Sequence, residues 1–238
     1  MRKMRLRRYL LGILIVGAGL FTAYLNFDRI ALFAASKLYS QEISYKHLAK
    51  DPMGAGLIFE DLRIMNSEVG VGFFSQRATV KPAWGPGWFR SALLDFKFKD
   101  VHFLKKRADE NKTTYDTLSQ LIAMPFEGRW MYKEVAGLVE IFSNGITIKR
   151  FSADGKEMRL IVTGDLYYNN VVDLDATIYF SKEVLKEIPL ELHSVIMQDE
   201  PNEWKSFSVK IKGNLSSPSV QITGKVFRLN FGTITVKD

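Results

Sequence analysis

The sequence contains no cysteine and only three histidines in 238 residues. The absence of cysteine excludes a disulfide scaffold, a thiolate metal site and a cysteine nucleophile. His47, His102 and His193 are widely spaced and lack the short-range pairing of a metal site, so we expect each one on the surface or in the core. A chain of this length buries enough core to fold without disulfides, which suits a bacterial periplasm.

The sequence also lacks the motifs of the common enzyme classes. No G-x-S-x-G elbow, P-loop or G-x-G-x-x-G fingerprint is present, because Gly54-Ala-Gly56 and Gly70-Val-Gly72 each lack the third glycine. Asp173 and Asp175 share one face of an expected strand with other polar positions, which favours a solvated outer face over a metal site or an acid pair. We therefore expect no catalytic set, no metal and no cofactor.

Most of the positive charge has a topological role. Five basic residues of the formal +7 lie in residues 1–8, MRKMRLRR, and removing them leaves +2 for the rest of the chain. The remainder has no broad basic field and no arginine-rich element with interleaved aromatics, so nucleic acid is not an expected partner.

The longest uncharged run is Tyr9–Phe27, nineteen residues that as a helix would span roughly 28 Å, close to the hydrocarbon thickness of a bilayer. The basic tip before it predicts a cytoplasmic N-terminus and export of the rest of the chain. A cleaved signal peptide and a buried soluble helix are the alternatives, and the run is long for a signal and has no small-x-small triplet at its end. We interpret it as a single-pass inner-membrane anchor with a periplasmic bulk.

Beyond the anchor the apolar pattern has period two, broken by turn residues, and predicts an antiparallel β-fold. After Asp100 the apolar side changes parity, which predicts a bulge. Lys81–Phe89 reads as a turn, whose Trp84 and Trp88 either close the core or lie at a membrane interface. The expected strands are 43–49, 56–65, 70–80, 92–105, 127–142, 145–153, 157–168, 170–180, 205–213, 220–223 and 226–236.

Few helices are expected. Asp28–Gln41 has one apolar side, so it either caps the next domain or lies on the membrane surface. Thr113–Met124 and Ser181–Ile188 read as short helices, each followed by a proline. The predicted organisation is a basic tip (1–8), an anchor (9–27), a juxtamembrane helix (28–42), an N-terminal β sub-region with a linker helix (43–124) and a C-terminal antiparallel β sub-region (125–238).

The fold class is thus mainly β: an N-terminal transmembrane helix, then a curved, largely antiparallel sheet, groove-like or partly open, with one or two short helices. One face of such a sheet is apolar and must be covered or used. The alternation leaves open whether that face is a closed core or a groove for apolar ligands. In the groove interpretation its lining is one parity of the C-terminal strands: Ile146, Ile148, Leu160, Val162, Leu174, Ala176, Ile178, Val209 and Ile211.

Two stretches carry a family resemblance. Phe207–Ile222, FSVKIKGNLSSPSVQI, joins an alternating strand through Gly-Asn-Leu and a Ser-Ser-Pro turn to the next strand. Gly145–Phe180 repeats the pattern with Asp-Gly, Gly-Asp-Leu, Asn-Asn and Val-Asp-Leu-Asp. Both resemble the C-terminal part of AsmA-like proteins of the Gram-negative envelope, as does the layout of basic tip, anchor, short helix and strands such as Leu57–Met65.

This resemblance implies a role in outer-membrane biogenesis, because AsmA-like proteins are grouped with bridge-like carriers that hold lipid acyl chains in a curved sheet. The implied partners are phospholipid or another envelope lipid, and the inner membrane. The chain is far shorter than most family members, and it is also similar in size and layout to the inner-membrane subunit N of type II secretion systems. The alternative is therefore a structural adaptor of a secretion or envelope complex, which binds a partner through an edge strand or the Trp84/Trp88 turn.

Overall fold

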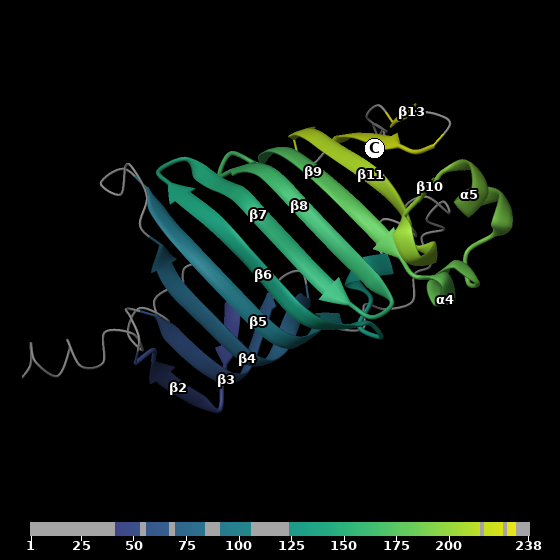
Figure 1. Ribbon diagram of the computed structural model, residues 1–238. Coiled ribbons are helices and arrows are strands. Elements are labelled where there is room, and N and C mark those ends of the chain that lie inside the picture. The colour runs from purple at the N-terminus through teal and green to yellow at the C-terminus, as the bar shows by residue number, and fades with distance from the viewer. Residues whose placement is uncertain are drawn as a thin grey trace, which may run out of the picture.

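Alternating apolar and polar residues build one antiparallel sheet, shown in Figure 1. The computed structural model describes residues 41–52, 56–66, 70–83, 91–105, 124–214, 217–225 and 228–231. Within these residues the strands are β1 (Gln41–Ser44), β2 (His47–Lys50), β3 (Leu57–Asn66), β4 (Val71–Ala83), β5 (Ala92–Lys105), β6 (Met131–Phe142), β7 (Gly145–Gly155), β8 (Met158–Tyr167), β9 (Val171–Phe180), β10 (Gln198–Asp199), β11 (Lys205–Asn214), β12 (Ser219–Thr223) and β13 (Arg228–Phe231).

The strand order follows the sequence almost without exception: β1-β3-β4-β5-β6-β7-β8-β9-β11-β12-β13, with β2 also on β3 and β10 on β11. Neighbours along the chain pair as hairpins, as the Asn-Gly and Asn-Asn turns predict, and Asn170 adopts a φ of 64°. The sheet is open, and it crosses the predicted sub-region boundary at residue 124 through the β5–β6 pair. The mainly β, antiparallel fold is confirmed.

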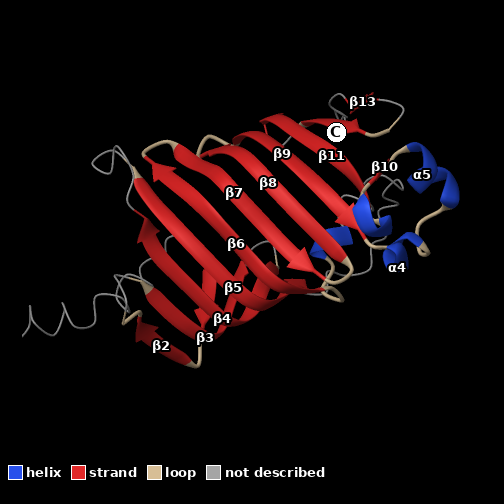
Figure 2. Ribbon diagram, in the orientation of Figure 1, coloured by secondary structure: helices blue, strands red, loops and turns tan. Residues whose placement is uncertain are grey.

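The helices that the structure describes are short and lie together at one end of the strands (Figure 2). They are the 3₁₀ turns η1 (Met124–Phe126) and η2 (Pro201–Glu203) and the α-helices α4 (Lys182–Leu185) and α5 (Leu190–Val195). The predicted helix Ser181–Ile188 is thus shorter than expected. The sequence interpretation missed α5, which begins directly after Pro189, where proline ends the preceding turn and leaves a new helix free to start.

Two predictions for the segment from residue 41 to residue 49 were wrong, one about a strand and one about a helix. The expected strand 43–49 is two strands, β1 and β2, which both pair with β3 and are separated where the Lys46 backbone amide bonds to the Glu60 carbonyl at 2.9 Å. Gln41 and Glu42, which we expected at the end of the juxtamembrane helix, instead belong to β1 and pair with Asn66 and Met65.

The predicted turn from residue 81 also starts too early. Strand β4 continues through Lys81, Pro82 and Ala83, which pair with β5. The described part of β3 pairs with β4 only as far as Val80. Beyond Val80 no backbone N–H of β4 has to donate to β3, so proline is tolerated at position 82.

The parity change at Asp100 is present, but it is not a bulge in a single strand. Phe98 and Val101 both face the core, and Asp100 between them has a φ of 51°. Asp61 on β3 lies in the same cross-strand row as Asp100 and has a φ of 52°. The residue pairs before and after this row follow the same register across β3, β4 and β5. The kink is therefore shared by neighbouring strands, which no one-strand pattern shows.

Several predictions lie outside the described residues: the basic tip and the anchor Tyr9–Phe27, the rest of the juxtamembrane helix, the Trp84 and Trp88 turn, the linker helix before Met124, and the chain after Phe231. Among the residues that are described, no helix combines the length and the apolarity needed to cross a bilayer.

Candidate functional site: the apolar face of the sheet

The register brings all nine predicted lining residues onto one face of the sheet. Ile148 on β7 lies beside Gly164, which pairs with Leu174, which pairs with Ile211. The neighbouring rows hold the other members: Ile146; Val162, Ala176 and Val209; Leu160 and Ile178. We call this surface the apolar face and the opposite surface the outer face.

The two ends of the apolar face differ in cover. At the end where β6, β8 and β11 begin, helix α4, the segment after it and residues Ile196 and Met197 pack onto the sheet as part of the main core cluster. Ile188, Ile196 and Met197 are buried there together with Phe180 and Phe207. We call this the capped end and the opposite end the distal end.

Burial divides the nine predicted residues between these ends. Leu160, Ile178 and Val209 are only 2%, 2% and 1% exposed and belong to the core cluster. The other six, Ile146, Ile148, Val162, Leu174, Ala176 and Ile211, are half-buried. These six side chains therefore keep some exposed surface, whereas the first three are part of the core.

The distal row contains a glycine. Gly164 lies in it between Ile148 and Leu174, with a φ of +128° that side chains rarely adopt. A Cβ at this position would collide with the backbone carbonyl of Asp173, so this position of the row carries no side chain. Val172 is the exception to the half-buried state of this end, since it is fully buried.

Sequence reasoning missed four phenylalanines of the apolar face. On β4, β5 and β7 four half-buried phenylalanines continue the apolar face beyond the aliphatic residues: Phe73, Phe96, Phe98 and Phe151. Their rings form a chain, with centroids 5.3 Å apart for Phe73–Phe98, 5.1 Å for Phe96–Phe98 and 6.2 Å for Phe96–Phe151. The Phe96 ring lies over Gly137, where a Cβ would clash with it. The alternation Phe96-Lys97-Phe98-Lys99 was the signal, but only the register joins it to Phe151.

The outer face carries paired charges. Asp173 lies opposite Lys212 and Asp175 opposite Lys210, each with a 2.8 Å ion pair. Further along, the hydroxyl of Thr147 donates to the Asp165 carboxylate at 2.6 Å. These cross-strand pairs satisfy the polar groups and each exposed pair contributes little to stability, typically below ~1 kcal/mol. The two aspartates thus have lysine partners on a solvated surface.

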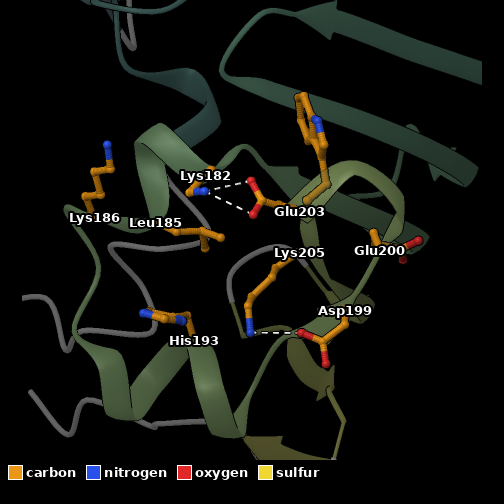
Figure 3. Close-up of a pocket in the computed structure, with 9 residues that line it drawn as sticks. Lys182, Leu185, Lys186, His193, Asp199, Glu200, Glu203 and Lys205 are labelled. Carbon is orange, nitrogen blue, oxygen red and sulfur yellow. Dashed lines mark hydrogen bonds and ion pairs between the residues drawn. The ribbon is translucent and has the colours of Figure 1, made fainter.

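A cavity of about 470 Å³ lies at the capped end between α4, α5 and η2, and Figure 3 shows its lining. Its charges are largely neutralised from within: Lys182 binds Glu203 at 2.8 Å, and Lys205 binds Asp199 at 2.9 Å. Hydrogen bonds from Lys225 and Lys205 lower the pKa of Asp199 to about 2. The ion pairs around the cavity connect the segments of the capped end to one another, and they leave the cavity without a strongly unbalanced charge.

The three histidines lie on three different elements. His47 is exposed on β2, His102 lies half-buried on β5, and His193 lies on α5 beside the capped-end cavity. In the part of the chain that the structure describes, no group of three histidine or acidic side chains is arranged to hold a metal ion.

The fold and the site together define an open antiparallel β-sheet protein with one apolar and one charged face. No protein-family model, curated protein or solved structure matches the chain.

Proposed function

We propose that this protein is an inner-membrane-anchored periplasmic protein of the AsmA-like type, which holds or guides lipid acyl chains on the distal half of its apolar face during envelope biogenesis. The observation that carries the proposal is the half-buried aliphatic row of Ile148, Leu174 and Ile211, which also contains Gly164. From β7 to β11 this row spans three strand spacings, roughly 14 Å.

Acyl chains suit this surface because it offers apolar area and no cluster of convergent polar groups. Each methylene moved from water onto such a surface contributes about 0.8 kcal/mol, so affinity needs no specific motif. A soluble protein rarely leaves a long apolar row accessible unless it binds something there. The capped end supports the same idea, because a groove closed at one end retains a chain better than one open at both.

The basic tip and the uncharged run Tyr9–Phe27 supply the membrane part of the proposal. They predict a cytoplasmic N-terminus, a single crossing and a periplasmic sheet.

The experiment is native mass spectrometry of the full chain extracted in mild detergent, with extraction and identification of co-purifying lipid. We expect phospholipid or another acyl lipid bound to the protein in a defined ratio. A protein partner in fixed stoichiometry without lipid would contradict the carrier function.

The second candidate is a structural adaptor, similar in layout to subunit N of type II secretion systems. The observation in its favour is the open sheet: among the described strands, β13 pairs only with β12, so its other edge has backbone groups available for a partner strand. The same mass spectrum separates the two, because the adaptor predicts the protein complex and the carrier predicts the lipid.

A further inference from the structure

Large exposed apolar side chains concentrate at the capped end. Phe126, Met131 and Leu190 lie there with 48%, 51% and 67% of their surface exposed. Among the residues that the structure describes, two others of this kind lie elsewhere: Ile161, 44% exposed in the middle of the outer face, and Tyr168, 54% exposed at the distal β8–β9 turn. A single exposed apolar residue is ordinary, whereas three around one end of a sheet mark a contact surface.

The first two flank the end of β5. Phe126 closes η1, and its ring meets Phe103 edge-on at 5.3 Å on the apolar side. Met131 is the first residue of β6 and pairs with His102. His102 directly precedes Phe103 in β5, and neighbouring strand residues point to opposite faces, so Met131 faces the outer side. Apolar surface on both sides of the same strand end suits a partner that approaches the end of the sheet, not one of its faces.

Leu190 belongs to the same rim. It opens α5, and the link between α4 and α5 is tied to the η1–β6 loop by an ion pair of 2.8 Å between Arg129 Nη1 and Glu187 Oε2. Arg129 also binds Glu127 at 2.7 Å, so the cation of this loop has carboxylate partners. We call Phe126, Met131 and Leu190 the apolar rim.

The chain enters the sheet at this end. Gln41, the first residue of β1, pairs with Asn66, the last residue of β3. Its neighbour Met65 aligns through Gly72 with Leu104, close to the end of β5 beside η1. The forty residues before β1 contain the uncharged run Tyr9–Phe27, so the predicted anchor connects to the end of the strands that carries the apolar rim.

We propose that the apolar rim rests on the surface of the lipid bilayer, so that the capped end faces the membrane and the distal half of the apolar face points away from it. The inference rests on the anchor of the proposed function. Because the Arg129 charge is paired, the contact needs apolar insertion and no anionic lipid, and phosphatidylcholine is a sufficient partner.

The cysteine-free sequence makes the test clean. Phe126→Cys and Leu190→Cys, labelled with a small fluorophore in the full chain, are compared with Ile161→Cys and Tyr168→Cys as matched exposed controls. Each variant is reconstituted in phosphatidylcholine vesicles with brominated acyl chains, and iodide serves as the aqueous quencher. We expect roughly threefold stronger quenching by brominated lipid at the rim than at the controls, since interfacial side chains insert to the level of the acyl boundary.

Every other result overturns the inference. Equal lipid quenching at all four positions, in a chain that floats with the vesicles, contradicts the rim contact and leaves the anchor intact. Rim labels shielded from both quenchers indicate a protein, or a second copy, on the rim. A chain that does not float with the vesicles refutes the anchor and, with it, the rim contact, independently of whether lipid co-purifies.

Discussion

The capped and distal ends of the apolar face have the same strand chemistry but different surroundings. Leu160 and Ile178 near the cap are sealed by the core cluster, whereas Leu174 and Ile148 near the distal end are half-buried. All four lie on one face of the neighbouring strands β7, β8 and β9. The difference teaches that an alternating strand specifies a face, while the elements packed on it decide whether that face is core or binding surface.

The largest contrast is expected from a matched pair of leucines. Leu160→Ala should destabilise by about 3 kcal/mol, because it leaves a cavity in the sealed core, and Leu174→Ala by about 1 kcal/mol, because its site is partly solvated already. Urea unfolding of the detergent-solubilised chain, followed by tryptophan fluorescence, measures both. Equal losses would mean that the two ends are packed alike.

The close backbone approach at Gly164 gives the next effect. Gly164→Ala adds a Cβ against the Asp173 carbonyl and strains a φ of +128°, and we expect a loss of about 2 kcal/mol. Gly213→Ala is the control, because it also has a positive φ, +97°, but no atom within 4 Å of the added Cβ. The control should cost about half as much. If the two cost the same, the close approach at Gly164 has no energetic weight.

A buried hydroxyl at the cap gives a smaller effect. Tyr132 Oη donates to the Pro125 carbonyl at 2.8 Å, and Tyr132→Phe should cost about 1 kcal/mol. Burial raises the pKa of Tyr132, so the folded protein keeps the neutral phenol. The wild type therefore loses stability as pH rises above about 10, where the unfolded tyrosine ionises, and the phenylalanine variant loses less. Tyr168→Phe at the exposed turn should change neither the free energy of unfolding nor its dependence on pH.

The smallest effect concerns the charges that hold the cap. Asp199 has a pKa of about 2 because Lys225 and Lys205 hydrogen-bond to it, so its ion pairs stabilise the fold above the ordinary aspartate pKa of about 4. That contribution disappears as pH falls from about 4 towards 2. Thermal unfolding of Asp199→Asn should show a slightly lower Tm than the wild type at pH 6 and almost no difference at about pH 1, below the folded pKa. A difference of the same size at about pH 1 would exclude the ion pairs as its cause.

The hairpin meander was predictable because its signals are local. Alternation places Ile146, Leu174 and Ile211 on one face, and turns such as Asn169-Asn170 set the strand ends. What the sequence hid depends on contacts between distant segments. The kink shared by Asp61 and Asp100, the continuation of β4 through Pro82 and the cover over Leu160 all require the neighbouring strand or helix to be known.

The same limit applies to the candidate site. The parity of the C-terminal strands was enough to choose nine residues of one face, but not to separate Val209 in the core from Ile211 on accessible surface. Phe151 escaped the prediction because a register shift on β7 between Ile148 and Phe151 brings both to the apolar face, and strict alternation would place them on opposite sides.

The most direct test of the central claim compares two isoleucines on opposite faces. Ile148→Asp places a charge in the distal row, and Ile161→Asp places the same charge on the exposed outer face. Both full-length variants are extracted in the same detergent, checked for folding by circular dichroism, and their bound lipid is quantified per protein by mass spectrometry. The account predicts that Ile148→Asp loses most of its lipid while Ile161→Asp retains the wild-type amount; equal retention in two folded variants would contradict it.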